Sequence, residues 1–293
     1  MGRRLRKIIP GLPYHLTHRG NHRSPILDTD ERRAMYVSIM IRWQIETGVR
    51  IAAFVIMPNH VHFIVESPTP DAISKWIANG HREYSKWLNT TRSTTGHNWE
   101  ERYFAVLMDP EHCLNALRYV EQNPVAAGLS AYPWDWHWSS APFHAGFGHK
   151  PVLLNHDLRP EGTSPATWRE ALLQPTAADF RSRLHECAAR GTALGDESWA
   201  RCLEAQHSID LLPKRRGRKP LPIQAPEPRF GRRRRDAWSK DIIRTATGDG
   251  ATDRSVTPGT DGVRAPVKIP PTVRAADFSG ENNWCQTNQE RIS

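Results

Sequence analysis

Two strongly apolar segments joined by a Pro-Asn pair set the first constraint on how this chain folds. Residues 50–57 (RIAAFVIM) and 60–66 (HVHFIVE) have the β-branched and aromatic composition of strands. Pro58-Asn59 between them is a tight-turn signal, because proline presets one turn dihedral and asparagine tolerates the unusual ones. We therefore expect a β-hairpin over residues 50–66.

The second strand of this hairpin carries two histidines separated by one valine. Alternate side chains of a strand share a face, so His60 and His62 should point the same way, with Cα atoms roughly 6.5–7 Å apart. Two imidazoles at that spacing can bind one cation. The alternative is a solvated strand face with two incidental histidines, and a His-x-His pair alone does not decide between them.

Strand and helix patterns alternate on either side of the hairpin. We expect the remaining strands and helices at 13–19 (strand), 30–48 (helix), 71–88 (helix), 102–108 (strand) and 110–123 (helix, ending before Pro124). The order β-α-β-β-α-β predicts an α+β, ferredoxin-like split β-α-β core with an antiparallel sheet flanked by helices. Such a fold hosts many functions and decides none of them.

The first of these helices has readable ends and an apolar face. Thr29 or Asp30 can begin it and Gly48 can end it. Its apolar face is expected to comprise Met35, Ile39, Trp43 and Ile45.

The positive charge of the chain is concentrated in one segment. The net charge is +9, and residues 213–235 hold ten of the 40 Lys and Arg residues but one of the 31 acidic residues. The excess therefore belongs to this Pro-rich arm, which indicates binding to a polyanion such as a nucleic acid. A solvated linker that only aids solubility is the alternative.

Cysteine spacing and hydropathy exclude several classes of protein. Cys113, Cys187, Cys202 and Cys285 have no pair spacing, so neither a zinc knuckle nor a disulfide framework is indicated. The basic start of the chain has no apolar stretch typical of a signal peptide, and no apolar run has the length of a membrane span. A reduced cytoplasmic protein without membrane contact is the expectation.

The helix expected over 110–123 carries a tyrosine away from its apolar side. Leu114, Leu117 and Val120 cluster on one side, whereas Tyr119 and Asn123 are neighbours on another, four residues apart. A half-buried aromatic ring with its hydroxyl at the surface is the common reason for such a tyrosine. The alternative is a nucleophile, with Asn123 giving one oxygen to the cation held by His60 and His62.

Several ordered motifs resemble one known family. MPNHVHFIVE (57–66) followed by LRYVEQNPVAAGL (117–129) resembles the REP-associated tyrosine transposases, a branch of the single-tyrosine HUH transposases. Further matches are YHLTHRGNHR (14–23), GHNWEERYF (96–104), YPWDWHWSSAPFH (132–144) and RGTALGDESWARCLE (190–204). The resemblance spans roughly residues 5–220.

The resemblance implies an activity and a set of site residues. It implies that Tyr119 is the catalytic nucleophile and that His60, His62 and Asn123 bind Mg²⁺ or Mn²⁺, with Gln122 remaining open as the third ligand in place of Asn123. The implied reaction is metal-dependent cleavage and joining of single-stranded or hairpin DNA, in particular REP-like palindromes, through a 5′-phosphotyrosine.

Candidate DNA contacts come from the basic and aromatic residues. We expect them at Arg19, Arg102, Arg118, Trp136, Arg215, Arg216 and Arg218. Bases could also stack on Trp99, Trp134 and Trp138, although packing beneath a loop is an equal alternative for these indoles.

The expected organisation has three parts. Residues 1–145 form the catalytic domain, residues 146–212 a helical extension, and residues 213–293 a basic, mostly disordered tail. We expect a monomer or homodimer in the cytoplasm, associated with the nucleoid. Two other functions stay open: a non-catalytic DNA-binding regulator of repeat elements, and a metal-dependent nuclease or phosphatase that uses water.

Overall fold

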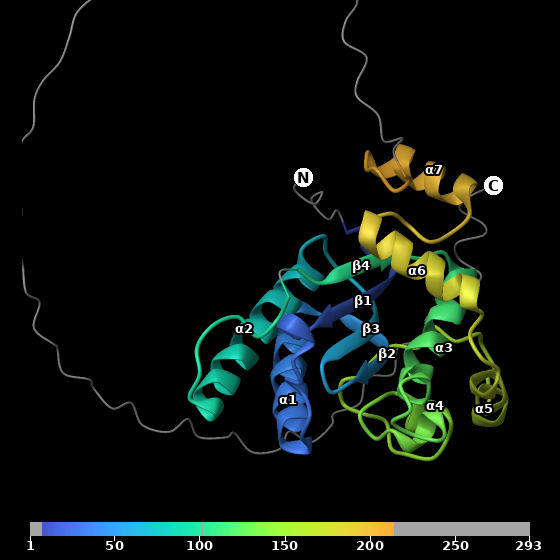
Figure 1. Ribbon diagram of the computed structural model, residues 1–293. Helices are drawn as coiled ribbons and strands as arrows, with labels where there is room; N and C mark the ends of the chain where they lie inside the picture. The colour runs from blue at the N-terminus through green and yellow to red at the C-terminus, as the bar shows by residue number, and fades with distance from the viewer. Residues whose placement is uncertain (1–7, 101, 214–293) are drawn as a thin grey trace, which may run out of the picture. The chain divides into compact units, whose positions relative to one another are not determined.

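The computed structural model describes residues 8–100 and 102–213, and its elements follow the order β1-α1-β2-β3-α2-β4-α3 with shorter helices afterwards (Figure 1). The strands are β1 (Pro13–Arg19), β2 (Arg50–Ile56), β3 (His60–Glu66) and β4 (Phe104–Leu107). The α-helices are α1 (Asp30–Thr47), α2 (Ala72–Arg92), α3 (Pro110–Ala126), α4 (Ala141–His144), α5 (Pro165–Leu173), α6 (Ala178–Arg190) and α7 (Glu197–His207). Two short 3-10 helices are η1 (Asn21–Arg23) and η2 (Pro133–Asp135).

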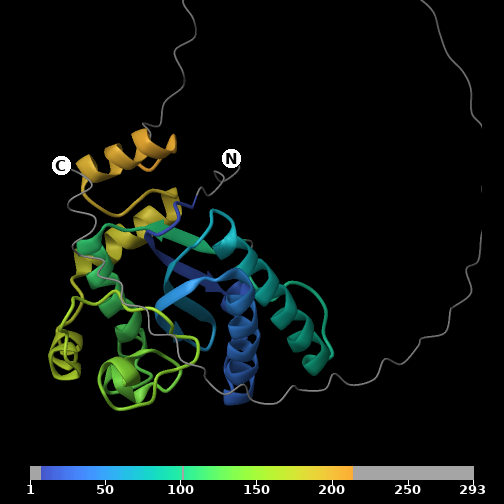
Figure 2. The ribbon, with the colours of Figure 1, turned by 180° about the vertical axis from the view of Figure 1, so that it is seen from behind.

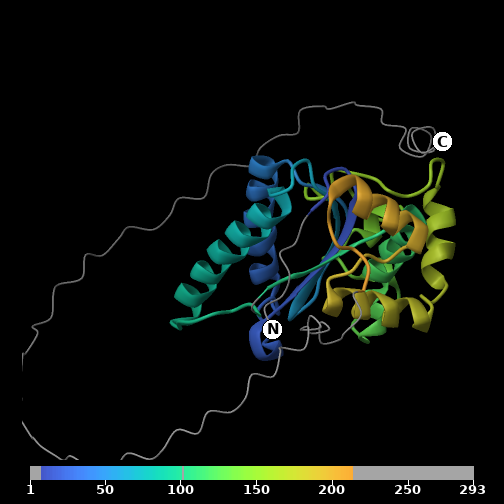
Figure 3. The same ribbon diagram turned by 90° about the horizontal axis from the view of Figure 1, so that it is seen from above.

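The four strands form one antiparallel sheet in the order β2-β3-β1-β4. With α1 between β1 and β2 and α2 between β3 and β4, this is the split β-α-β, ferredoxin-like arrangement. The α+β fold class expected from the sequence is confirmed. Figure 3 shows α1 and α2 on one face of the sheet and α3, α5 and α6 on the other.

Each face of the sheet has its own hydrophobic core. On β3, Val61, Phe63 and Val65 pack into the core beneath α1 and α2. Ile64 packs into the second core, which α3 covers together with residues of α5 and α6. The alternation along β3 therefore directs His62 toward α3, and burial of the flanking apolar residues holds the register of the strand.

The predicted turn and the predicted ends of the first helix are found at the expected residues, whereas α2, expected to end at residue 88, continues to Arg92. The backbone N–H of Met57 donates to the His60 carbonyl (2.9 Å), closing the Pro58-Asn59 turn. Thr29 is the N-cap of α1, and Gly48 ends that helix in the left-handed region (φ 69°), where a side chain would be strained.

The end that we expected for α3, before Pro124, is wrong. The helix continues through Pro124 to Ala126. Proline has no N–H to donate to the Val120 carbonyl. The side-chain amide of Asn123 instead donates to the carbonyls of Tyr119 (2.7 Å) and Val120 (3.5 Å), which supplies a substitute partner and lets the helix continue.

Two other expectations need correction. Ile45 is 77% exposed and does not belong to the buried face of α1, which contains Tyr36, Ile39 and Met40. Six residues beyond Ile39 the helix has turned by roughly 600°, so Ile45 lies on a different side. The expected strand 102–108 is shorter, because β4 pairs over Phe104–Leu107.

The outer edge of β2 is covered by the loop rich in tryptophan within residues 132–144. The N–H of Ile56 donates to the Trp138 carbonyl (2.9 Å), and the N–H of Ser140 donates to the Phe54 carbonyl (3.0 Å). Covering an edge strand in this way satisfies its backbone groups and blocks pairing with another chain.

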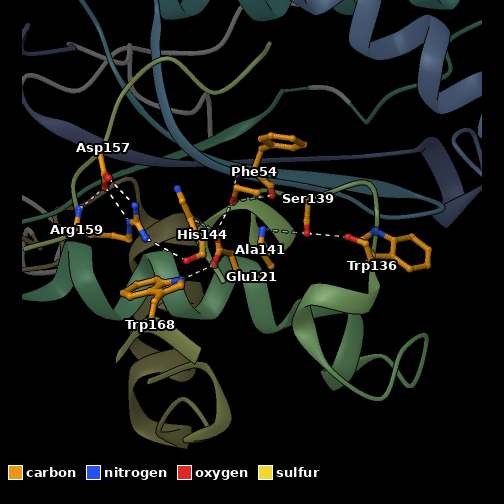
Figure 4. A network of polar contacts seen from close by, with 10 residues as sticks. Phe54, Glu121, Trp136, Ser139, Ala141, His144, Asp157, Arg159 and Trp168 are labelled. Atoms are coloured by element: carbon orange, nitrogen blue, oxygen red, sulfur yellow. Dashed lines mark hydrogen bonds and ion pairs between the residues drawn. The ribbon is translucent and has the colours of Figure 1, made fainter. Parts of the chain in front are cut away.

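A buried carboxylate ties α3 to α4 and α5 (Figure 4). Glu121 is 0% exposed and accepts hydrogen bonds from the Ser140 hydroxyl, from His144 Nδ1 (2.5 Å) and from Trp168 Nε1 (2.8 Å). Three donors from two segments compensate for removing this charge from water. The network thereby fixes the segment after α3 against the helix that carries Tyr119.

The last two helices pack against opposite cores. Phe180 and Leu184 anchor α6 in the core that α3 covers, beside β4 (Figure 2). Ala200 and Leu203 place α7 against the other core. Between the two helices, the N–H of Leu194 donates to the Leu107 carbonyl (2.8 Å), so the connecting segment runs along the end of β4.

Residues 8–213 fall within one compact unit. Whether it divides into a catalytic domain up to residue 145 and an extension over 146–212 stays a prediction. The tail expected over 213–293 lies outside the described residues apart from Pro213. Within the part of the chain that the structure describes, no helix has the length and apolar character needed to cross a membrane.

Candidate functional site

His60 and His62 lie side by side on the face of β3 that α3 covers. Their ring centroids are 5.0 Å apart and the rings are nearly perpendicular (82°). His62 is 5% exposed, whereas His60, at the start of the strand, is half-buried. His60, at the end of the sheet, is thus the more accessible of the two imidazoles.

The His60 ring is oriented by its neighbour in the turn. His60 Nδ1 donates to Asn59 Oδ1 (2.7 Å), while Asn59 Nδ2 donates to the Arg23 carbonyl (3.1 Å). Because the Arg23 carbonyl can only accept, it orients the Asn59 amide with its oxygen toward His60. Nε2 of His60 therefore keeps its lone pair, as a metal ligand requires.

His15 on β1 orients His62 in the same manner. His15 Nε2 and His62 Nδ1 are 2.9 Å apart, and the two rings stack with centroids 5.1 Å apart. When His62 Nδ1 donates its proton to His15, His62 Nε2 is the atom left to bind a cation. A second residue that fixes the tautomer of a ligating histidine is the usual arrangement around metal sites.

Burial keeps these three imidazoles neutral. Burial lowers the pKa of His60 to about 4 and that of His15 to about 3, with smaller effects of the charges of Arg19 and His185 respectively. Burial also holds the pKa of His62 well below its usual range. Neutral imidazoles at physiological pH are ready to coordinate a cation without first losing a proton.

Tyr119 on α3 reaches over the two histidines. Its ring centroid lies 5.7 Å from that of His62 and 5.9 Å from that of His15, edge-on to both. Its hydroxyl lies 3.3 Å from Nε2 of His185 on α6. The side chain is half-buried between the sheet and α6, and is not turned away toward solvent.

Burial also controls the acidity of the phenol. It raises the pKa of Tyr119, and the charges of Arg181 and Arg19 and a hydrogen bond from Asn123 offset only part of that rise. The phenol is therefore protonated at neutral pH. A reaction of its oxygen as a nucleophile requires the proton to leave.

The two amides considered as a third ligand have different surroundings. Gln122 is buried and engaged at both ends: Nε2 donates to the carbonyls of Leu172 (2.8 Å) and Gln174 (2.6 Å), and Oε1 accepts from Thr176. Asn123 is half-buried, and its Nδ2 donates to backbone carbonyls of α3. Among the described residues, no hydrogen bond to its Oδ1 is found. Asn123 therefore remains the expected third ligand, and its contact with a metal stays a prediction.

The donor set fits a divalent ion of the kind that also binds phosphate. No cluster of three or more His, Cys, Asp or Glu side chains suited to a metal occurs among the described residues. With the expected Asn123 oxygen beside the two imidazoles, a cation at this site would keep further positions for substrate oxygens.

Comparison with known proteins agrees with this geometry. Residues 9–123, which contain the whole sheet, both histidines and Tyr119, match the family described as "Transposase IS200 like". This segment is an IS200-like transposase domain. The transposase family indicated by the sequence motifs is thus confirmed.

Solved structures give partial overlaps with the transposase domain and the residues after it. One is a REP-associated tyrosine transposase bound to a REP hairpin: identity is 22%, the TM-score is 0.42, and the match covers 56% of this chain and 97% of the other. Another is a protein from Deinococcus radiodurans R1 assigned as a transposase, with 20% identity, a TM-score of 0.30 and coverage of 41% and 97%. No significant match was found among curated proteins.

Arg19 is the predicted phosphate-binding arginine that lies at the site of the transposase domain. It ends β1 directly opposite His60, and its charge acts on the pKa of His60, His62 and Tyr119. A cation at this point can attract a phosphate to the His60 end of the histidine pair. Contact between Arg19 and DNA stays a prediction.

The other predicted DNA contacts have different surroundings. Arg118 donates to the carbonyls of Ala171 (3.0 Å) and Gln174 (2.6 Å), which holds α5 against α3. Arg102 is half-buried two residues before β4. A role of either residue on DNA stays a prediction. Arg215, Arg216 and Arg218 lie outside the described residues.

The tryptophans divide into buried and partly accessible rings. Trp99 is 8% exposed and stacks on His81 (centroids 3.9 Å apart), so it is part of the core and offers no ring face to a base. Trp136 is half-buried: its N–H donates to the Ile56 carbonyl (3.1 Å), and the Arg33 guanidinium lies over its ring (5.1 Å). Base stacking on Trp136 stays a prediction.

Three residues at the site were not found from the sequence. His15 belongs to the alternating strand pattern PYHLTHR, but its contact with His62 depends on the register between β1 and β3. Arg181 and His185 lie on α6, outside the segment that matches the family. Nothing in the spacing of α6 indicates that it covers Tyr119.

Proposed function

We propose that the chain cleaves and rejoins single-stranded or hairpin DNA, with Tyr119 as the nucleophile and His60, His62 and Asn123 as ligands of Mg²⁺ or Mn²⁺. The observation that carries the proposal is the position of Tyr119 edge-on to His62, with centroids 5.7 Å apart, beside the His60–His62 pair in a transposase domain. A divalent ion, when bound, would polarise the scissile phosphate.

Tyr119 exchanges one phosphodiester bond for another in the proposed reaction. Oη of Tyr119 forms a bond to phosphorus, and the bond between phosphorus and the 3′ oxygen breaks. The products are a 5′-phosphotyrosine and a 3′-hydroxyl strand end. Because the phosphodiester bond is exchanged and not hydrolysed, a 3′-hydroxyl can reverse the step and join strands without ATP.

The proposed substrate class follows from the motifs and the charge. The ordered motifs resemble the REP-associated branch, which implies palindromic repeats that form hairpins. Arg19 beside His60 provides a cation for a phosphate at the site. Trp136 and the neighbouring indoles of the loop could stack unpaired bases, which is worth about 1–3 kcal/mol per base.

A covalent adduct tests this function. A labelled hairpin oligonucleotide from the repeats beside the coding region is incubated with the protein and Mn²⁺, and a species that survives a denaturing gel is expected. Tyr119→Phe keeps the ring but should give no adduct. His60→Ala, His62→Ala or excess EDTA should abolish cleavage while the variants stay folded and retain much of their DNA affinity.

Each rival function gives a different result in the same experiment. A non-catalytic regulator binds the hairpin but gives neither product nor adduct. A nuclease that uses water gives free 5′-phosphate ends and no adduct, and Tyr119→Phe would leave it active. Cleavage that persists in excess EDTA would contradict the metal assignment.

A further inference from the structure

Helix α6 covers Tyr119, although it lies outside residues 9–123, which match the transposase family. Phe180 and Leu184 anchor it in the core, and the Phe180 ring lies near the Tyr119 ring (centroids 6.4 Å apart). Arg181 follows Phe180 and His185 follows Leu184, so Arg181 and His185 are four residues apart. They therefore lie on neighbouring parts of one face of α6.

His185 is directed at the reacting atom. Its Nε2 lies 3.3 Å from the Tyr119 hydroxyl, and the two rings meet edge-on with centroids 6.4 Å apart. A catalytic base must lie within hydrogen-bond reach of the proton that it takes, and such distances are commonly somewhat long before substrate binds.

Arg181 adds positive charge at the same point. Of the groups that act on the phenol, its charge gives the largest lowering of the Tyr119 pKa. Its Nε is buried and has no hydrogen-bond partner within the described part of the chain. A buried guanidinium N–H without a partner is costly unless something binds there, and a phosphate oxygen is a good acceptor for it.

We infer that α6 supplies two further catalytic residues of the proposed reaction: His185 as the base that takes the Tyr119 proton, and Arg181 as a contact to the scissile phosphate. This inference rests on the proposed function. Since α6 lies outside residues 9–123, the region after the transposase domain completes its active site.

The proton and electron balance of the step is simple. The lone pair of His185 Nε2 takes the phenolic proton as Tyr119 Oη forms its bond to phosphorus. The electron pair of the broken bond leaves on the 3′ oxygen, which takes a proton from water and becomes a hydroxyl. His185 then returns its proton to solvent. Strand joining runs through the same steps in reverse.

The experiment measures the single-turnover rate of adduct formation with the hairpin oligonucleotide and Mn²⁺. His185→Ala should lower the rate by about 10²–10⁴-fold, the usual contribution of a positioned base. Added imidazole should restore part of it. His185→Gln keeps a hydrogen-bond acceptor but cannot take a proton, so it should be as slow as the alanine variant and should not respond to imidazole in the same way.

The pH profile separates a base from a structural residue. The His185→Ala rate should depend more steeply on pH than the wild-type rate, because hydroxide must take the Tyr119 proton in the variant. The other titratable or charged groups near this space are Tyr119, His15, His60, His62, Arg19 and Arg181. All of them are retained in the His185 variants, so a change of profile belongs to His185.

Arg181 is tested against a matched neighbour. Arg181→Met should slow adduct formation at saturating DNA, and Arg181→Lys should restore part of the rate because it keeps the charge. Arg183→Met removes the same charge from an exposed position two residues along α6 and should change the rate little.

The outcomes are distinguishable. Wild-type protein without an adduct would overturn the proposed function and this inference together. An adduct in wild type, with folded His185→Ala and His185→Gln forming it within threefold of the wild-type rate and with the same pH profile, would overturn the role of His185 alone. Equal effects of Arg181→Met and Arg183→Met would overturn the role of Arg181.

Discussion

His15 Nε2 lies 2.9 Å from His62 Nδ1, so a residue of β1 determines which nitrogen of the β3 histidine faces the proposed metal. Replacing His15 by Phe keeps a ring stacked on His62 but removes the ring nitrogen that contacts His62 Nδ1. We expect the affinity for Mn²⁺ to fall by about 10–100-fold, as is typical when such a supporting residue is lost. Titration calorimetry with Mn²⁺ measures this, and a high Mn²⁺ concentration should restore adduct formation.

The matched control for this prediction is on the same strand. His18 points to the opposite face, where its Nδ1 lies 2.7 Å from His81 Nδ1. His18→Phe should therefore lower stability without changing the affinity for Mn²⁺. Equal Mn²⁺ affinities for wild type and His15→Phe would show that His15 does not orient His62.

Glu121 links the stability of the fold to pH. Burial alone raises the pKa of this carboxyl, but the charge and hydrogen bond of His144 and the hydrogen bonds of Ser140 and Trp168 outweigh it, so the pKa is lowered. A carboxyl whose folded-state pKa is below its unfolded value of about 4.5 contributes stability above that pH. The contribution is lost as the pH falls through the folded-state pKa.

Glu121→Gln should therefore lower the free energy of unfolding by about 3 kcal/mol at pH 7, because it leaves buried donors without their charged acceptor. The difference from wild type should narrow as the pH falls below about 4.5. Urea unfolding at pH 7 and at acidic pH measures both effects. Glu111→Gln, an exposed position in the first turn of the same helix, is the control and should change little.

The sequence was sufficient for the parts of the site that depend on local periodicity. The period of two along β3 placed His60 and His62 on one face, and the turn and capping residues located the hairpin and the first helix. The transposase motifs then pointed to Tyr119. These features depend on residues a few positions apart, which a single sequence displays.

The remaining parts depend on contacts between distant segments. His15 meets His62 because β1 and β3 pair in one register, and His185 meets Tyr119 because α6 folds back over α3. The continuation of α3 through Pro124 depends on a side-chain hydrogen bond from Asn123, which no helix propensity includes. Periodicity carries no information about such pairings.

A side chain at Gly20 would disturb the backbone next to Asn59, the residue that orients His60. A Cβ at this position would lie 2.4 Å from the Ser24 carbonyl oxygen, and the Gly20 N–H donates to the Asn59 carbonyl (2.7 Å). Gly20→Ala must therefore move the backbone that positions Asn59 and, through it, His60. We expect a loss of about 1–3 kcal/mol in the free energy of unfolding, together with weaker Mn²⁺ binding.

The control is a glycine whose substitution strains the backbone elsewhere. Gly11 has φ +75° and no atom within 4 Å of an added Cβ. Gly11→Ala should lower stability through that strain alone and leave Mn²⁺ affinity unchanged. If Gly20→Ala also leaves the Mn²⁺ affinity unchanged, the link from the turn to His60 is wrong.

The last prediction concerns the arm at 213–235, which lies almost entirely outside the described residues. Its ten cations and single acid should contact phosphates, so truncation after Leu212 should weaken DNA binding and flatten its salt dependence. Each phosphate neutralised contributes about −0.7 to the slope of log K against log salt for single strands. The truncation should not unfold α7, because the backbone N–H groups of Leu211 and Leu212 keep their bonds to Glu204.

Adduct formation at saturating DNA should survive this truncation, since every proposed catalytic residue lies before residue 190. Preference among hairpin sequences should survive as well, because phosphate contacts carry little base information. The decisive measurement is the salt slope of the full-length and truncated proteins on one oligonucleotide. Replacing the ten cations by Gln in the full-length chain is the matched control, because it removes charge without shortening the chain. Equal slopes for all three proteins would mean that the arm does not contact DNA and acts only on solubility.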